Sequence, residues 1–272
     1  MWGSLRRPLL AGLCFALVSA PCALAGTISE KPDIEDRANP VQGDWVRPAD
    51  IVYVGDSESL GYFGDDLYRD LSAQRDPRTG RPLRVWTYWT CGSDATTWLM
   101  GGTTFCGIRS CDGAGQCARD HGPNDGPAHV KYAPLRRYLG EIKPRLTIVS
   151  LGTNIMTTHD FDRPAVYQSY LFDVGELIGE IKAAGSRCIW IGPPEPALST
   201  RSIAEYRRLT GDLARIAKAG GCDFVDSDPL SDRAYVLKRD SEGIHYRSEG
   251  EKAWEAKLWP VIEPLVMAGL KG

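Results

Sequence analysis

The chain has 272 residues, of which 43% are hydrophobic, 25% charged and 9% aromatic, and its formal net charge is −3 at pH 7. This composition is that of an ordinary globular protein, and it excludes a disordered, collagen-like or coiled-coil chain. The small net charge gives no electrostatic footprint for nucleic acid, so no nucleic-acid partner is predicted.

The N-terminal segment has the features of a secretory signal peptide. Arg6 and Arg7 precede an apolar run from Leu9 to Val18, and Ala23-Leu24-Ala25 forms a small-residue cleavage site. We therefore expect residues 1–25 to be removed and the mature protein to be secreted or periplasmic. The apolar run has about half of the length that a membrane-spanning helix needs, and no later stretch supplies that length. No integral membrane segment is expected in the mature chain.

The rest of the chain divides into an extended lead-in, residues 26–50, and one domain, residues 51–272. In this domain short apolar runs alternate with segments of helical periodicity. In chain order, we predict strand 51–54, a helix carrying Leu60 to Leu71, strand 83–89, strand 146–151, a helix from Pro164 to Gly185, strand 188–191, a helix from Ser202 to Gly220, a strand from 223, and a last helix from Ser248. Such alternation predicts an α/β fold, here a three-layer α/β/α sandwich with a central five-stranded parallel sheet.

A long glycine-rich and cysteine-rich loop at about 91–144 interrupts this alternation. A compact domain rarely holds such a loop unless it is functional or covalently stapled. Within it, Trp98 and the strand residue Trp89 have two interpretations, as core residues, which we favour, or as a platform for a sugar ring or acyl chain. Calcium binding by Asp120, Asn124 and Asp125 is disfavoured, because their spacing does not match a calcium loop.

Six cysteines remain after removal of the signal peptide, namely Cys91, Cys106, Cys111, Cys117, Cys188 and Cys222. An even number in an exported protein predicts disulfides, although six cysteines allow fifteen pairings. We predict that Cys188 pairs with Cys222, because both open strands that should be neighbours, and that the other four pair among themselves. The alternative is a zinc site formed by those four and His121, which the absence of any Cys-x-x-Cys pair disfavours.

The candidate functional residues follow the predicted strands, because ligands of open parallel sheets bind beyond the carboxyl ends of the strands. Each strand end offers glycines together with a nucleophile, a polar donor or a base. The segments are Gly55-Asp56-Ser57, Cys91-Gly92-Ser93-Asp94, Gly152-Thr153-Asn154, Gly192-Pro193-Pro194 and, before the last helix, Glu242-Gly243-Ile244-His245.

Ser57 is the candidate nucleophile, because it stands where a strand turns into a helix. A serine hydroxyl needs an adjacent base, and that base needs an orienting carboxylate. His245 is the candidate base, since Glu242 precedes it by three residues. Each residue also has a purely structural interpretation: Ser57 as a helix cap, His245 as a surface histidine, Asn154 as a turn residue and Glu242 as a solvated loop acid.

These motifs resemble the sequence blocks of the SGNH (GDSL) hydrolase superfamily. Gly55-Asp56-Ser57 matches the first block, Gly152-Thr153-Asn154 the third, and Glu242-Gly243-Ile244-His245 stands in the place of the fifth, Asp-x-x-His. The blocks occur in the order of the family and span residues 51 to 250. Three departures stand out. Ile155 stands where the family has an aspartate after the third-block asparagine. Glu242 stands in place of the fifth-block aspartate, and Asp240 is the fallback for that role. Either Gly92 or Asp94 occupies the position of the second-block glycine.

The resemblance implies a flavodoxin-like sheet of the SGNH type and a serine esterase. His245 would take the proton from Ser57, which attacks an ester carbonyl, and Glu242 would orient the imidazole. The oxyanion hole would consist of the N–H groups of Ser57 and Gly92 and the side-chain amide of Asn154. This chemistry needs no metal and no organic cofactor.

The expected substrate is a small-molecule or glycan ester, most specifically an O-acyl (acetyl) group on a carbohydrate or cell-wall glycan. The alternatives are acyl transfer to a glycan by the same serine, or a non-catalytic glycan-binding protein of the same fold. The sequence makes no prediction of the oligomeric state.

Overall fold

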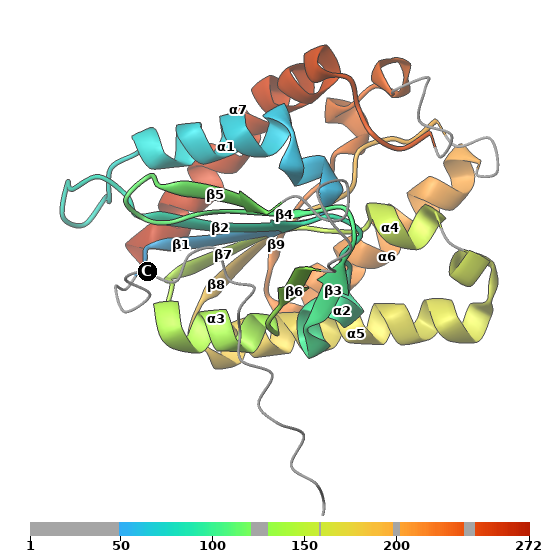
Figure 1. Ribbon diagram of the computed structural model, residues 1–272, viewed down its shortest axis with the longest axis horizontal. Coiled ribbons are helices and arrows are strands. Elements are labelled where there is room, and N and C mark those ends of the chain that lie inside the picture. The colour runs from blue at the N-terminus through green and yellow to red at the C-terminus, as the bar shows by residue number, and fades with distance from the viewer. Residues whose placement is uncertain (1–48, 121–129, 158, 198–201, 237–242) are drawn as a thin grey trace, which may run out of the picture. The chain divides into compact units, whose positions relative to one another are not determined.

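A mixed seven-stranded sheet forms the centre of the fold (Figure 1). The computed structural model describes residues 49–120, 130–157, 159–197, 202–236 and 243–272, which all belong to one compact unit. The strand order is β5-β4-β2-β1-β7-β8-β9. Five neighbouring strands of this sheet are parallel, β2 (Val85–Thr90), β1 (Ile51–Gly55), β7 (Leu146–Ser150), β8 (Arg187–Ile191) and β9 (Asp223–Val225). The predicted α/β fold and its flavodoxin-like strand order are therefore confirmed.

The strand count differs from the prediction, because the cysteine-rich segment adds a hairpin to the sheet. Its strands are β4 (Ile108–Cys111), which pairs antiparallel with β2, and β5 (Cys117–Asp120), which pairs antiparallel with β4. Each has only four residues. Runs this short, among glycines and cysteines, do not display the alternation that identifies a strand in sequence.

The remainder of the predicted loop 91–144 also holds regular structure. Strands β3 (Gly102–Thr104) and β6 (Val130–Tyr132) form a separate two-stranded sheet. Helices α2 (Ala95–Met100) and α3 (Leu135–Ile142) flank it in the chain. The described parts of the segment thus form a folded insertion between β2 and β7.

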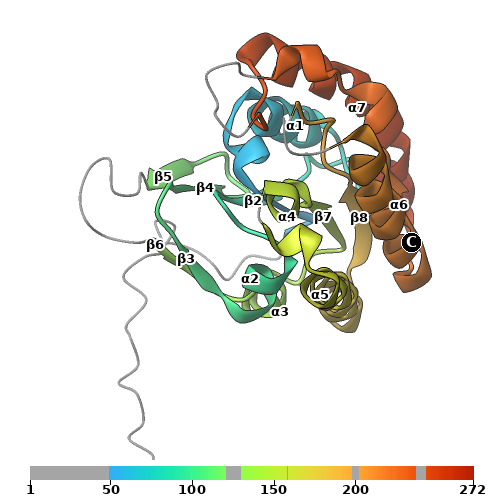
Figure 2. The ribbon, with the colours of Figure 1, turned by 90° about the vertical axis from the view of Figure 1, so that its right-hand side faces the viewer.

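Helices cover both faces of the sheet and complete the predicted three layers (Figures 1 and 2). On one face lie α1 (Tyr62–Ala73) and α7 (Ser248–Lys271), whose aromatic rings Phe63 and Trp254 stack at 3.7 Å between centroids. The other face is covered by α2, α3, α5 (Pro164–Ala183) and α6 (Ile203–Gly220). Shorter helical turns are η1 (Ser57–Leu60), α4 (Thr153–Thr157), η2 (His159–Asp162), η3 (Asp228–Leu230) and η4 (Arg233–Tyr235).

The buried side chains agree with the core interpretation of the aromatic residues. Trp89 and Trp98 are both fully buried, so neither is a surface platform. Trp89 packs with the core layer under α1 and α7, whereas Trp98 packs with the layer under α3 and α5.

Three disulfides crosslink the domain, Cys91–Cys106, Cys111–Cys117 and Cys188–Cys222. The last joins the start of β8 to the residue before β9, as expected for cysteines that open neighbouring strands. The first two lie within the insertion. The four cysteines proposed as zinc ligands are therefore held in disulfides, and no group of residues that could hold a metal ion is found within the described ranges.

Two sequence predictions fall outside the described residues. They are the signal peptide, residues 1–25, and all of the lead-in 26–50 except its last two residues. In the part of the chain that the structure describes, none of the helices combines the length and the apolar character that a membrane span requires.

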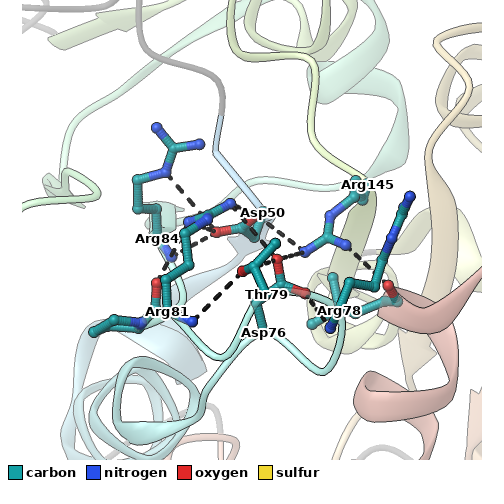
Figure 3. Close-up of polar contacts among 9 residues, drawn as sticks. Asp50, Asp76, Arg78, Thr79, Arg81, Arg84 and Arg145 are labelled. Atoms are coloured by element: carbon teal, nitrogen blue, oxygen red, sulfur yellow. Dashed lines mark hydrogen bonds and ion pairs between the residues drawn. The ribbon is translucent and has the colours of Figure 1, made fainter.

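A buried ionic cluster lies at the amino-terminal edge of the sheet (Figure 3). Asp50, Arg84 and Arg145 each precede a strand, β1, β2 and β7 respectively. The Asp50 carboxylate, which is 3% exposed, accepts hydrogen bonds from Arg81 Nη2 at 2.6 Å, from the Arg84 amide at 2.9 Å and from Arg145 Nη2 at 3.1 Å. A second carboxylate, Asp76, lies 3.0 Å from Arg145 Nη2. The cluster therefore ties the starts of three strands together.

The neighbouring groups keep Asp76 ionised. Burial alone would raise the pKa of its carboxyl, but hydrogen bonds from the Arg78 amide, Thr79 and Arg145 lower this pKa to about 2. Both carboxylates of the cluster thus carry dedicated donors, which is the condition under which buried charges are tolerated.

Replacement of Asp50 tests the contribution of this cluster to stability. We expect Asp50→Asn to lower the free energy of unfolding by about 3 kcal/mol, because it leaves partly buried guanidinium groups without their counter-charge. The matched control is Glu141→Gln, whose carboxylate forms an exposed ion pair with Arg137 at 3.1 Å. That variant should change stability by less than about 1 kcal/mol. Urea denaturation measures both, and equal effects of the two substitutions would contradict the expectation.

Candidate active site

Ser57 lies directly beyond the carboxyl end of β1, at the first position of η1. The turn requires glycine at position 55, because a Cβ atom there would overlap the side chain of Ser59. Asp56 is the N-cap of η1, and its Oδ1 accepts a hydrogen bond from the Glu58 amide at 3.1 Å. Ser57 is therefore the first residue of the helical turn and not its cap.

His245 contacts Ser57. The His245 Nε2 atom lies 2.9 Å from Ser57 Oγ, although the two residues are 188 positions apart in sequence. This is the contact that a serine nucleophile and a histidine base require.

Neighbouring segments hold the backbone around His245 on both sides. The Gly243 carbonyl accepts a hydrogen bond from the Ala197 amide at 2.9 Å, and the Tyr246 hydroxyl donates to the Glu195 carbonyl at 2.9 Å. Tyr246 also forms a β-bridge with Val236. The segment after β8 and the segment after η4 thus hold the backbone on both sides of His245.

The acidic candidates for orienting this imidazole, Glu242 and its fallback Asp240, lie outside the described residues. The same holds for His121, Asn124 and Asp125, and no side-chain position is described for Asp120. The choice between Glu242 and Asp240 stays a prediction.

The ends of β2 and β7 are joined to the end of β1 through Ser93. Asn154 Nδ2 donates a hydrogen bond to the Ser93 carbonyl at 2.8 Å. The Ser93 hydroxyl lies 3.3 Å from the Gly55 carbonyl, two residues before Ser57. The sequence placed Ser93 at a strand end but did not predict this bridging role, which only the tertiary contacts reveal.

Two backbone donors at these strand ends are available to a ligand. Among the described residues, the N–H groups of Ser57 and Gly92 have no hydrogen-bond acceptor. Gly92 has a φ of +75°, in the left-handed region that favours glycine. The amide of Asp94, the alternative to Gly92, already donates to Thr97 Oγ1 at 2.9 Å, which favours Gly92 as the backbone donor.

Asp56, the residue before Ser57, has a buried carboxyl group. Burial raises its pKa to about 7, while the hydrogen bond from Glu58 and the proximity of His245 partly oppose that rise. The folded protein therefore holds a proton on Asp56 at pH values where an unfolded chain would release it. The stability that this proton contributes is complete below about pH 4 and is lost as the pH rises through about 7.

The variant Asp56→Asn should remove this pH dependence, because an asparagine oxygen can still accept from the Glu58 amide. We expect the variant to gain stability relative to the parent as the pH rises from 5 to 8, by about 3 kcal/mol. Urea denaturation across this range measures the difference. Asp223→Asn, in which an exposed carboxyl is removed, is the control and should give a difference that does not change with pH. A constant difference for Asp56→Asn as well would contradict the assigned burial effect.

A pocket of about 310 Å³ lies apart from these residues, between η2, the start of α5 and α6. Arg208 lies over the rings of Phe161 and Tyr167 at its wall, and the Tyr167 hydroxyl donates to Asp212 at 2.9 Å. Neither Ser57 nor His245 lines it.

Comparison with solved structures identifies the fold. TesA superposes with a TM-score of 0.50 at 14% sequence identity, and the match covers 79% of this chain and 98% of TesA. A putative SGNH hydrolase from Slackia heliotrinireducens matches with a TM-score of 0.48 at 13% identity over 80% of this chain and 98% of its own. An acetyl-xylooligosaccharide esterase from Geobacillus, Axe2, matches at 0.49 and 13% over 80% and 95%.

No family model matches the sequence, and no curated protein sequence is detectably similar to it. The chain thus shares the fold of TesA, an α/β fold as its sequence predicted. What it does with this fold depends on the residues of the site.

Proposed function

We propose that the protein is a serine hydrolase that cleaves a carboxylic ester, with Ser57 as the nucleophile and His245 as the general base. The observation that carries this proposal is the 2.9 Å contact between His245 Nε2 and Ser57 Oγ. Two loops that are distant in sequence bring these atoms together beyond the carboxyl ends of the strands, which is where open α/β sheets bind ligands.

The proposed reaction has two halves. His245 Nε2 takes the proton from Ser57 Oγ while this oxygen bonds to the ester carbonyl carbon. The tetrahedral intermediate collapses, the alcohol leaves with the proton from His245, and the acyl group remains on Ser57. Water then repeats the sequence with His245 as the base, which releases the acid and restores the serine. Glu242, or Asp240 in its place, would hold the imidazole tautomer.

The negative charge on the carbonyl oxygen needs donors held in place before the reaction. The N–H groups of Ser57 and Gly92 serve as such donors, because no acceptor among the described residues occupies them. The side-chain amide of Asn154, whose Nδ2 donates to the Ser93 carbonyl at 2.8 Å, is the proposed third donor. One such donor typically contributes about 3 kcal/mol of transition-state stabilisation.

The proposed substrate is an O-acyl group, in particular an acetyl group, on a carbohydrate or cell-wall glycan. The N-terminal features of an exported protein and three disulfides suit an environment outside the cytoplasm, where such glycans occur. Acyl transfer and glycan binding without catalysis are distinguished from hydrolysis by the experiments below.

Replacement of the paired residues tests the proposal directly. With p-nitrophenyl acetate as the substrate, we expect Ser57→Ala and His245→Gln each to lower kcat by at least about 10³-fold, because each removes one partner of the proton transfer. Ser248→Ala, in which an exposed serine hydroxyl at the start of α7 is removed, should keep the parental rate. A folded Ser57→Ala variant with parental activity would overturn the assignment.

Covalent labelling separates an enzyme from a binding protein. A fluorophosphonate probe should modify the parent at Ser57 and leave Ser57→Ala unmodified, as read by intact-mass spectrometry. A folded parent that forms no adduct would support the glycan-binding alternative. Incubation with acetylated glycans then separates the two reactions, because hydrolysis yields free acetate and transfer yields a newly acylated sugar.

A further inference from the structure

The segment of residues 104–107 is attached to Cys91 by several bonds. Cys106 forms a disulfide with Cys91, and the Cys91 amide donates to the Gly107 carbonyl at 3.0 Å. The Thr104 hydroxyl donates to the Cys91 carbonyl at 2.7 Å and accepts from the Cys106 amide at 3.2 Å. The side chain and both backbone groups of Cys91 are thus fixed by this one piece of the insertion.

The residue on the other side of Gly92 is fixed equally well. Ser93 is fully buried, and its amide and hydroxyl both donate to the Thr90 carbonyl, the hydroxyl at 2.8 Å. The hydroxyl also accepts from Trp98 Nε1 at 3.1 Å, and the Ser93 carbonyl accepts from Asn154. Ser93 cannot move without breaking contacts to β2, α2 and α4.

Gly92 itself is open. A Cβ atom at this position would meet nothing within 4 Å, and the Gly92 N–H has no acceptor among the described residues. The Gly92 N–H lies between Cys91 and Ser93, which are both fixed by hydrogen bonds, so the direction of this N–H group is fixed as well. That is the property an oxyanion donor needs, because it then requires no reorganisation during the reaction.

We infer that the Cys91–Cys106 disulfide and the Thr104 hydroxyl are positioning groups that hold the Gly92 amide as an oxyanion donor. The inference rests on the proposed function and extends it to residues that do not contact the substrate. The inference assigns a role in catalysis to the cysteine-rich insertion, because residues 104–107 of the insertion fix the turn that follows β2. Loss of either anchor should slow the chemical step and leave ground-state binding of the ester unchanged.

The first test removes the crosslink. We expect the double variant Cys91→Ser/Cys106→Ser to lower kcat for p-nitrophenyl acetate by about 10- to 100-fold, with KM within about twofold of the parent, since complete loss of one donor costs about 10²- to 10³-fold. The matched control is Cys111→Ser/Cys117→Ser, which removes the other disulfide of the same insertion, between β4 and β5. The control should retain the parental kcat.

The second test keeps the disulfide and therefore applies even if the first variant does not fold. Thr104→Val preserves the shape of a side chain that is 3% exposed and removes only its hydroxyl. We expect kcat to fall by about five- to tenfold with KM unchanged, because the Gly92 N–H would be displaced from its position but not removed. Thr103→Val, at an exposed position of the same strand, is the control and should have no effect. Circular dichroism confirms that each variant is folded.

The outcomes separate this inference from the proposed function. Parental activity in Ser57→Ala would overturn both. Loss of activity in Ser57→Ala, together with parental kcat in a folded Cys91→Ser/Cys106→Ser variant, would overturn the positioning role alone. If that double variant fails to fold, parental kcat in Thr104→Val overturns the positioning role. A rise in KM with unchanged kcat in any anchor variant also overturns it, because this would indicate a role in substrate binding.

Discussion

The common register of three parallel strands is the constraint on which the site depends. Gly55, the last residue of β1, pairs with Trp89 of β2 on one side and with Ser150 of β7 on the other. Because the three strands end level, the loops that follow them start at one edge of the sheet. Ser57, Gly92 and Asn154 thereby follow strands at the same edge of the sheet, although nearly a hundred residues separate the first from the last. A shift of one residue in either pairing would turn every side chain of that strand to the opposite face.

The two edges of the parallel sheet carry opposite kinds of chemistry. At the amino-terminal edge, the Asp50 carboxylate accepts hydrogen bonds from Arg81, Arg84 and Arg145. At the carboxyl edge, the N–H groups of Ser57 and Gly92 lack acceptors among the described residues, and Asp56 is buried with a raised pKa. Ion pairs thus hold the strands together at one edge, whereas the other edge presents backbone donors that a ligand can accept from.

Sequence alone predicted the features that follow from periodicity and from short motifs. The five parallel strands, the long helices that cover them and the chain positions of Ser57 and His245 all follow from local patterns. The Cys188–Cys222 pairing followed from an additional assumption, that the strands they open are neighbours.

Sequence could not predict the interior of the insertion. Strands β4 and β5 owe their existence to pairing with β2, and a four-residue run has no intrinsic preference strong enough to show this. The contacts of Thr104 and Ser93 around Gly92 were hidden for the same reason, since they join segments whose proximity depends on the whole fold. The imidazole contact with Ser57 was predictable as chemistry, whereas the supports of His245 from Ala197 and Glu195 were not.

The β4–β5 hairpin has a further consequence for the behaviour of the protein in solution. Without it, β2 would be the border of the sheet, and its sequence, Val-Trp-Thr-Tyr-Trp-Thr, is entirely buried in the present fold. A flat, aromatic and uncharged strand with unpaired backbone groups is a template for intermolecular association. The hairpin shifts the border to β5, a four-residue strand whose sequence, Cys-Ala-Arg-Asp, is half charged. The same insertion that anchors the turn at Gly92 therefore also shields the sheet against aggregation.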